Sequence, residues 1–317
     1  MKYKRPSFYF HPHIETIAPA LTRKIKDFSY SERKRINTPD DDFLDLDLVN
    51  DGNESVVILS HGLEGNSTRP YIKGMARALS KAGFDVVAWN YRGCSEEINR
   101  QLRFYHSGAT DDLQLIIDFA IESGYQSIHL IGFSLGGNIT LKYMGEQGIH
   151  VNSYIQSAVA FSVPLDLHTS CIQISKPGNF LYAKRFLKNL KAKVKAKAQV
   201  MPDKIDTRPL PKLKALIDFD DCYTAPIHGF KDAVTYYHKC SSIRFVDNIR
   251  VPSLIVNALN DPFLSKECYP VSRFNDHDYV TFETPQQGGH VGFTEFKTDG
   301  IFWSEKRAVN FIKANTP

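Results

Sequence analysis

Apolar runs of strand length alternate with segments of helical period along most of the chain, and this alternation constrains the fold more than any other feature. It is typical of βαβ units, in which helices connect the strands of a largely parallel sheet. Two connecting segments, 71–83 and 109–124, have an apolar face and end in glycine, as helices commonly do. We therefore expect an α/β fold. The predicted buried strands are residues 55–60, 84–90, 127–132, 157–163, 253–259 and 279–284.

One further run, "DFLDLDLV" at 42–49, alternates strictly between apolar and polar residues. Such a period of two indicates a strand with one buried face and one face in water. We predict that it is a half-buried antiparallel strand at the edge of the sheet.

The alternation stops between residues 167 and 247. About 80 residues stand where one connecting helix would suffice, which favours an inserted unit over a loop. We therefore divide the chain into three parts. Residues 1–166 form the first part of the core with an N-terminal extension, 167–247 form a helical cap insertion, and 248–317 complete the core.

The predicted cap begins with a strongly basic helix. Residues 176–202 contain eight Lys or Arg and no Asp or Glu. Ala183, Leu187, Leu190 and Val194 recur at helical spacing, so the basic residues are expected to cover the remaining surface. A basic amphipathic helix can make a peripheral contact with a membrane or an acidic partner. The alternative is a solvated cap helix whose apolar stripe the main domain covers.

Composition excludes several classes of protein. A net charge of +4 is too small to indicate nucleic-acid binding. The five cysteines form no C-x-x-C pair, so neither a disulfide framework nor a zinc site is expected, and a reducing cytoplasm is the natural location. The N-terminus lacks the apolar core of a signal peptide, and polar residues interrupt the longest uncharged run, 123–141. We expect a soluble cytoplasmic protein.

Metal and cofactor motifs are also missing from the sequence. It contains neither H-E-x-x-H nor the G-x-x-x-x-G-K-[ST] phosphate loop. The acidic runs at 39–43 and 218–221 lack the spacing of a calcium loop, and we interpret them as solvated loops or helix starts. No metal and no cofactor is predicted.

Ser134, in "IGFSLGGN", is the candidate nucleophile. The G-x-S-x-G pattern by itself could be an ordinary glycine turn, but here it follows a predicted strand and precedes the helical segment 136–148. In a sharp strand-to-helix turn, side chains at Gly132 and Gly136 would collide with neighbouring backbone. The helix would also direct its N-terminal dipole toward an anion formed at the serine.

A serine nucleophile needs a base, and the base needs an orienting acid. After such a turn, the acid and then the histidine follow later strands. Asp261 directly follows the strand 253–259, and His290 follows the strand 279–284 through a glycine-rich loop. Asp166 also follows a strand and remains an alternative acid.

The other histidines have weaker contexts. His61 and His106 lie in loops at the predicted active edge, where we interpret them as structural or supporting groups. His129 lies within a strand and is expected to pack in the core. His228, His238 and His277 do not follow a strand end.

Acyl transfer also requires donors for the developing oxyanion. The backbone N–H of Leu135, directly after the nucleophile, is the first candidate. The second is the N–H of Leu63, in the irregular loop that follows the strand 55–60.

These segments together resemble the α/β-hydrolase superfamily and, within it, the YheT-type family. The resemblance rests on "HPHIETIAPAL", "LSHGLEGNSTRPYIKGMARALSKAGFDVVAWNYRGCSEEINR", "FYHSGATDDL", "LIGFSLGGNITLKYMGEQG", "NALNDPFLS" and "GGHVGF". It implies a mostly parallel eight-stranded sheet with helices on both faces and a helical cap between the sixth and seventh strands of the core. It also implies a triad of Ser134, Asp261 and His290, with Leu63 and Leu135 as oxyanion donors. In "HPHIETI", Glu15 stands where relatives more often have Gln, and we assign this segment no active-site role.

The expected function is a serine esterase that cleaves small-molecule carboxylic esters with lipophilic or medium-chain acyl groups through an acyl-enzyme. Two alternatives stay open. An acyltransferase would pass the same acyl group to an alcohol, and a non-catalytic binding protein could retain the fold. The sequence does not indicate the oligomeric state.

Overall fold

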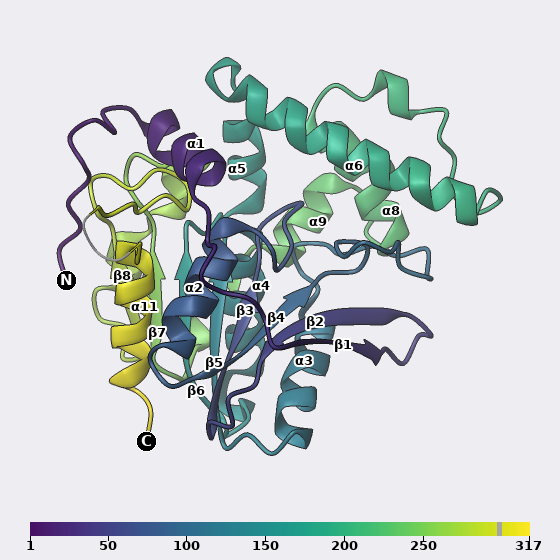
Figure 1. Ribbon diagram of the computed structural model, residues 1–317. Coiled ribbons are helices and arrows are strands. Elements are labelled where there is room, and N and C mark those ends of the chain that lie inside the picture. Colours follow the sequence, from purple (N-terminus) through teal and green to yellow (C-terminus); the bar gives the residue numbers. More distant parts are fainter. Residues whose placement is uncertain (297–299) are drawn as a thin grey trace.

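The computed structural model describes residues 1–296 and 300–317 and is built around one eight-stranded sheet (Figure 1). The strand order is β1-β2-β4-β3-β5-β6-β7-β8. Strands β3 to β8 pair in parallel, whereas β2 is antiparallel to both β1 and β4, so the predicted mostly parallel sheet is confirmed. The strands are β1 (Glu32–Asn37), β2 (Phe43–Val49), β3 (Ser55–Ser60), β4 (Asp85–Asn90), β5 (Ser127–Phe133), β6 (Ile155–Phe161), β7 (Ser253–Val256) and β8 (Val280–Glu283).

The strand predicted at 42–49 is present and antiparallel, but the prediction that it is half-buried and lies at the edge of the sheet is wrong. The strand β2 lies between β1 and β4, and all its residues are buried. The edge position belongs to β1, whose sequence "ERKRIN" lacks the apolar alternation of a strand. Arg33 and Arg35 of β1 lie 2.8 and 2.7 Å from the carboxylates of Asp47 and Asp45 of β2. These ion pairs cover the polar face of β2, which the sequence pattern had assigned to water.

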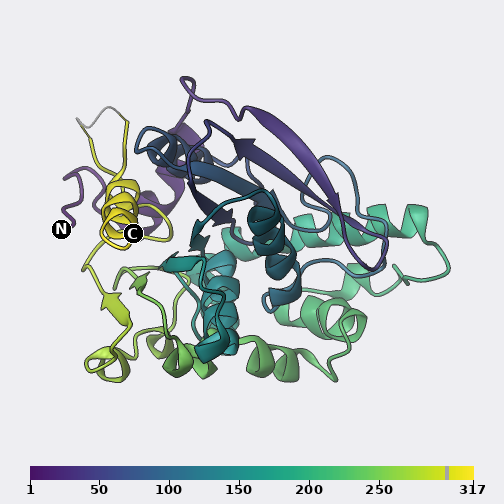
Figure 2. The ribbon, with the colours of Figure 1, turned by 90° about the horizontal axis from the view of Figure 1, so that it is seen from below.

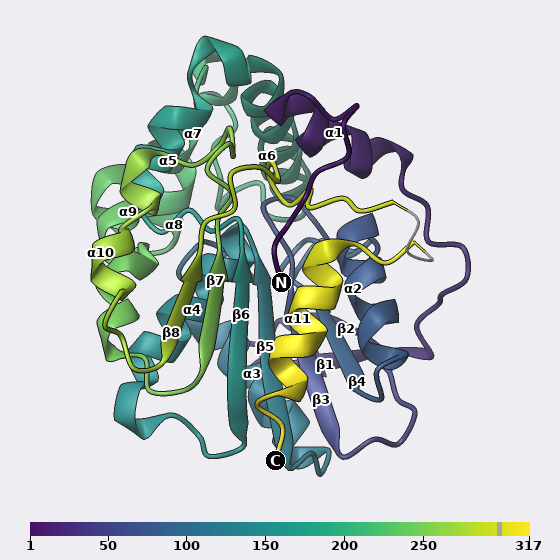
Figure 3. The ribbon, with the colours of Figure 1, turned by 90° about the vertical axis from the view of Figure 1, so that its left-hand side faces the viewer.

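Helices cover both faces of the sheet. The helices α2 and α11 pack on one face, and α3 and α4 pack on the other (Figure 3). Gly83 and Gly124, which follow α2 and α3, have φ angles of 87° and 94°, as expected of glycines that end a helix. These helices are α2 (Pro70–Ser80), α3 (Thr110–Glu122), α4 (Leu135–Gln147) and α11 (Trp303–Lys313), and a short α10 (Val271–Phe274) precedes β8.

A layer of helices lies over the carboxyl ends of the parallel strands (Figures 1 and 2). It consists of the chain between β6 and β7 together with the N-terminal helix α1, which lies beside the start of the long helix α6 (Figure 1). Among the described residues, no helix has the length and apolar character that a membrane crossing needs. The helices of this layer are α1 (Pro12–Thr22), α5 (Leu167–Ile174), α6 (Phe180–Val200), α7 (Leu216–Phe219), α8 (Ala225–Ile227) and α9 (Ala233–Cys240).

The basic residues of helix α6 do not all face the solvent. Its apolar stripe packs into the cluster formed by the inserted helices, where Leu187 and Val194 are buried. Two of its lysines point inward, contrary to the expectation that all basic residues cover the surface. The Lys193 ammonium lies 2.7 Å from the Glu64 carboxylate, and the buried Lys197 donates hydrogen bonds to Asn99. The core loops supply oxygen acceptors that the helix pattern alone does not reveal.

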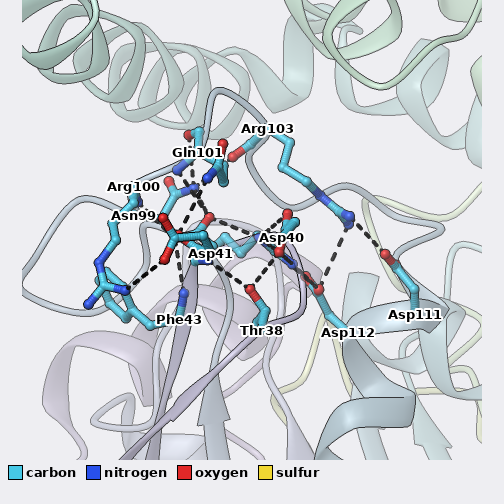
Figure 4. Close-up of polar contacts among 12 residues, drawn as sticks. Thr38, Asp40, Asp41, Phe43, Asn99, Arg100, Gln101, Arg103, Asp111 and Asp112 are labelled. Carbon is cyan, nitrogen blue, oxygen red and sulfur yellow. Dashed lines mark hydrogen bonds and ion pairs between the residues drawn. The ribbon is translucent and has the colours of Figure 1, made fainter.

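The acidic run at 39–43 is only in part the expected solvated loop, because Pro39, Asp40 and Asp41 are exposed in a turn, whereas Asp42 is buried. The Arg92 guanidinium, whose side chain is 2% exposed, contacts the carboxylates of Asp40, Asp42 and Asp112 at 2.8 to 2.9 Å. Asp42 also accepts a hydrogen bond of 2.6 Å from the Asn99 amide. Figure 4 shows neighbouring contacts of the same region, in which Arg103 lies 2.8 Å from Asp111. Because Asn99 in turn accepts from Lys197, this buried network connects the core to the inserted helices.

Candidate active site

Ser134 lies in a sharp turn between β5 and α4. Its φ and ψ are 54° and −118°, a strained conformation for a residue with a side chain. A Cβ atom on Gly132 would lie 2.3 Å from the Gly136 carbonyl oxygen, and one on Gly136 would lie 2.3 Å from the Ser60 carbonyl oxygen. The turn therefore requires both glycines, for the steric reason expected from the sequence. It leaves the serine side chain at the carboxyl edge of the sheet.

The structure brings the three predicted residues of the triad together. The His290 Nε2 atom lies 3.0 Å from Ser134 Oγ, and the Nδ1 atom lies 2.8 Å from Asp261 Oδ2. The Asp261 side chain is fully buried, and that of His290 is 10% exposed. The loop after β7 positions Asp261, where its Oδ1 atom also accepts the Phe263 N–H at 2.9 Å. These distances fit the hydrogen-bond chain that a nucleophile, its base and an orienting acid require.

The alternative acid lies elsewhere. Asp166 is the N-terminal cap of α5, and its carboxylate accepts hydrogen bonds from the N–H and the hydroxyl of Thr169. None of the hydrogen bonds among the described residues joins it to His290. Asp166 therefore has a helix-capping role in this structure.

The histidines in the neighbouring loops are buried and partnered. His61 contacts the Gly62 carbonyl oxygen at 2.8 Å, and burial lowers its pKa to about 3. His106 accepts the Gly108 N–H, and burial, followed by the nearby His228, lowers its pKa to about 3. Both imidazoles are therefore neutral at physiological pH. His129 packs within β5 beside Ser157, as expected of a core residue.

The two predicted oxyanion donors lie beside Ser134. Leu63, Leu135, Ser134 and His290 line the same cavity. A Cβ atom on Gly62 would lie 3.3 Å from Ser134 Cβ, so the loop after β3 passes close to the serine. Within the described chain, the turn, loop and cap hydrogen bonds do not use the N–H of Leu63 or Leu135, whereas the N–H groups of Gly62 and Glu64 donate to tyrosine hydroxyls.

Two cavities meet at Ser134 and His290. The larger, about 310 Å³, lies between α1, α6 and the loop after β3. The smaller, about 130 Å³, extends under the inserted helices. Phe186 of α6 and Phe263 line both cavities. Apolar side chains form much of the wall of the larger cavity and include Ile17, Ala20, Leu21, Phe133, Leu181 and Val291.

Polar side chains also line the smaller cavity, among them Asp220 of the second acidic run. This run lies at helix starts, one of the two expectations from the sequence: Asp218 is in the first turn of α7, and Asp220 and Asp221 are in the first turn of the helical segment that follows. Burial raises the pKa of Asp220 to about 6, and its carboxylate accepts hydrogen bonds of 2.6 and 2.5 Å from Thr224 and Tyr237. The described residues form no group of three or more His, Cys, Asp or Glu that could hold a metal ion.

Sequence reasoning missed the contribution of the N-terminal segment. Thr16 of α1 lines the larger cavity, and its hydroxyl oxygen accepts the His290 N–H at 2.9 Å. Tyr182 and Phe263 line the same cavity, and Phe263 lies against the His290 ring at 4.2 Å between centroids. The segment "HPHIETI" was visible as a motif, but its contact with a loop almost 280 residues later depends on the tertiary fold.

Comparison of the sequence with known proteins identifies related families and proteins. The sequence model of the alpha/beta hydrolase fold family matches residues 55–296. The YheT protein of Escherichia coli (strain K12) is 32% identical over 288 residues, which cover 89% of this chain and 84% of that protein. The medium-chain fatty acid ethyl ester synthase/esterase 2 of Saccharomyces cerevisiae is 27% identical and covers 98% of this chain and 70% of its own length.

A solved structure supports the fold. The Pyrococcus furiosus esterase Pf2001 superposes with a TM-score of 0.61 at 16% identity, covering all of this chain and 98% of that chain. At this identity the similarity extends to the fold alone. The family match, together with the similarity to YheT over most of both sequences, assigns the chain to the alpha/beta hydrolase fold family and, within it, to the YheT-type family.

Proposed function

We propose that this protein is a carboxylic ester hydrolase that uses Ser134 as a nucleophile. The observation that supports this most strongly is the hydrogen-bond chain from Asp261 through His290 to Ser134. The yeast relative is named as an esterase as well as an ester synthase, which supports ester hydrolysis. An intact serine, base and acid argue against a binding protein that has lost catalysis.

In the acylation step, His290 Nε2 accepts the Ser134 proton while the serine oxygen attacks the ester carbonyl. The Asp261 carboxylate accepts the hydrogen bond from His290 Nδ1–H, which keeps Nε2 free to act as the base and stabilises the imidazolium that forms. The N–H groups of Leu63 and Leu135, with the N-terminus of α4, stabilise the tetrahedral oxyanion. His290 then donates the proton to the leaving alcohol.

In the deacylation step, a water molecule replaces the alcohol. His290 takes a proton from the water, the resulting hydroxide attacks the Ser134 ester, and the proton returns to Ser134 Oγ as the acid leaves. The cycle consumes one ester and one water and yields one acid and one alcohol.

The walls of the two cavities favour lipophilic substrates. An apolar space that extends from Ser134 beneath the inserted helices suits an acyl chain better than a small sealed pocket would. The medium-chain acyl groups in the name of the yeast relative point in the same direction. Hydrolysis of p-nitrophenyl acetate, butyrate, octanoate and palmitate tests this. We expect the highest kcat/KM among the butyrate and longer esters, and activity confined to acetate would contradict it.

Acyl transfer to an alcohol is the second candidate, because the name of the yeast relative includes an ester synthase. The same acyl-enzyme would react with an alcohol in place of water. The ratio of ethyl octanoate to octanoic acid, formed from p-nitrophenyl octanoate in dilute ethanol, separates the two functions. A transferase should give mainly the ethyl ester although water is in large excess, and a hydrolase should give mainly the acid.

The start of α6 is suited to a peripheral contact with an anionic membrane. Phe180 and Leu181 are 58% and 72% exposed, and Lys184 and Lys188 follow on the exposed side of the helix. We expect more co-sedimentation with phosphatidylglycerol vesicles than with phosphatidylcholine vesicles, and less at high salt. K184E/K188E should weaken it, whereas K313E on α11 should not. Equal binding by the two charge variants would contradict this contact.

A cytoplasmic location is part of the same proposal. All five cysteines are free thiols in the structure, which suits a reducing compartment. Fractionation of cells that express the protein at its natural level tests this. Recovery of the folded protein outside the cytoplasm and its membrane surface would contradict it.

A further inference from the structure

The loop that contains His290 is fixed by an unusual set of contacts. Four successive backbone N–H groups, those of residues 288–291, each donate to the oxygen of a side chain. None of these bonds belongs to a helix or a strand. The donor and acceptor pairs are Gly288 to Glu15 at 2.7 Å, Gly289 to Asn260 at 3.0 Å, His290 to Thr16 at 2.9 Å and Val291 to Ser162 at 2.9 Å.

Two of the four acceptors come from the N-terminal helix α1. The Glu15 side chain is 1% exposed, and its second oxygen accepts a hydrogen bond of 2.8 Å from the Asn260 amide. Asn260 directly precedes Asp261, so Glu15 connects the loop of the acid to the loop of the histidine. Arg5 lies 3.2 Å from the same oxygen of Glu15.

The backbone of the histidine loop also passes unusually close to α1. A Cβ atom on Gly292 would lie 2.3 Å from the Glu15 carbonyl oxygen, and one on Gly289 would lie 2.8 Å from Thr16 Oγ1. Gly289 has a φ of 57°, a conformation that favours glycine, and its N–H donates to the Asn260 side-chain oxygen. The backbone of the histidine loop therefore packs directly against α1, with no space for a side chain at Gly292.

We propose that Glu15 and Thr16 are positioning residues for His290, so that the N-terminal helix is a working part of the active site. This inference rests on the proposed function of Ser134 and His290. It also goes beyond the family match, which begins at residue 55, well after α1. The segment to which we assigned no active-site role from the sequence thus holds the backbone of the general base.

The physical reason is geometric. His290 must keep Nε2 about 3 Å from Ser134 Oγ while its Nδ1 faces Asp261, and its ring orientation depends on the backbone at residue 290. A displacement of about 1 Å can reduce a rate by about a hundredfold. Loss of the Thr16 acceptor leaves the His290 N–H without its partner, because Thr16 is the acceptor within hydrogen-bond distance in this structure.

Thr16→Val tests the proposal, since it keeps the shape of the side chain and removes the acceptor. Thr22→Val is the matched control. Both threonines lie on α1, and each hydroxyl donates a hydrogen bond of 2.8 Å to the carbonyl four residues earlier, but only Thr16 contacts the histidine loop. Thr16→Ser restores a hydroxyl and should recover the activity. Glu15→Leu, which removes both acceptor oxygens at this position, tests the second acceptor.

The measurement is the second-order rate of labelling by a small fluorophosphonate, with kcat and KM for p-nitrophenyl butyrate, normalised to folded protein. We expect Thr16→Val and Glu15→Leu to lower the labelling rate and kcat about tenfold or more, with KM changing less than kcat, while Thr16→Ser and Thr22→Val stay within about twofold of wild type. The downfield proton signal of the His290–Asp261 hydrogen bond should shift or broaden in Thr16→Val and persist in Thr22→Val.

The outcomes separate this inference from the proposed function. If wild type is not labelled, the proposed function fails. If wild type, Thr16→Val and Thr22→Val are labelled at the same rate, Ser134 is still the nucleophile and the positioning role fails. A lower thermal stability of Thr16→Val with an unchanged rate per folded molecule would also overturn it, because α1 would then act only as structure.

Discussion

Asp261→Asn is the sharpest perturbation of the active site, because the two side chains have nearly the same shape. In the native structure, Asp261 Oδ1 accepts the Phe263 N–H at 2.9 Å, and Oδ2 accepts from His290 Nδ1 at 2.8 Å. An asparagine has one oxygen and one NH₂ group. The buried Phe263 N–H requires the oxygen at the Oδ1 position, so the NH₂ group takes the Oδ2 position, which is the nearer of the two to His290 Nδ1, at 2.8 Å against 3.1 Å.

The expected loss of activity follows from this orientation. With an NH₂ group beside it, His290 Nδ1 must become the acceptor, and the ring proton moves to Nε2. The Nε2 atom then points a hydrogen at Ser134 Oγ, 3.0 Å away, and cannot take its proton. A wrong tautomer of this kind lowers kcat by about 10⁴ in a serine protease, which corresponds to about 5 kcal/mol of transition-state stabilisation. Because the substitution keeps the packing, we expect little change in the free energy of unfolding.

The assay is the steady-state hydrolysis of p-nitrophenyl butyrate, with urea unfolding measured in parallel. Asp166→Asn is the control, because Asp166 is the alternative acid but caps α5 in the structure. It should retain activity within about threefold of wild type and lose at most about 1 kcal/mol of stability. A folded Asp261→Asn variant within tenfold of wild type would refute the reasoning, as would a greater loss of activity in Asp166→Asn.

Three other predictions concern the scaffold. Gly136→Ala places a Cβ atom 2.3 Å from the Ser60 carbonyl oxygen, so it should cost about 1–3 kcal/mol or more in urea unfolding and slow the labelling of Ser134; an unchanged midpoint would contradict the tight turn. Arg92→Met removes the cation nearest to the buried Asp42 and leaves Asp112 with the more distant Arg103 at 3.8 Å, so it should lower the unfolding free energy by about 3–5 kcal/mol, whereas Arg208→Met, at an exposed ion pair, should change it by less than about 1 kcal/mol. Burial raises the folded-state pKa of Asp220 from 3.8 to about 6, so the folded protein keeps a proton that the unfolded chain releases. The unfolding free energy should therefore fall by up to about 3 kcal/mol as the pH rises from about 4 to 7, and Asp220→Asn should lack this component. If the unfolding free energies of wild type and Asp220→Asn changed with pH in the same way, the raised pKa of Asp220 would be contradicted.

The core of the fold could be predicted from the sequence because burial imposes a pattern on it. Strands β3 to β7 are short, buried and mostly apolar runs, and the helices between them have one apolar face, so both have a periodicity that can be read directly. The strand β8, which was also expected to be buried, lies at the other edge of the sheet, and of its residues Val280 alone is buried. The edge strand β1 could not be predicted in this way. Its arginines are stabilised by Asp45 and Asp47 on the neighbouring strand, and a pairing between two strands leaves no period in either one.

The same distinction applies to the site. Ser134, Asp261 and His290 each follow a strand, so their meeting at one sheet edge follows from the topology. The inward lysines of α6, the aspartates around Arg92 and the contact of Glu15 with the histidine loop depend on partners far away in the sequence. A charged residue looks the same in sequence whether it faces water or a buried partner. These contacts therefore required the three-dimensional structure.

The most direct test of the account is intact-mass spectrometry of the protein after reaction with a fluorophosphonate, with the modified peptide then sequenced. We expect one adduct per chain on Ser134, no adduct in Ser134→Ala, and strongly slowed formation in His290→Ala. The same experiment with p-nitrophenyl octanoate, quenched in acid at early times, should show an octanoyl group on the same serine. An adduct on another residue, or a folded wild-type protein that remains unmodified, would contradict the proposal that Ser134 is an activated nucleophile.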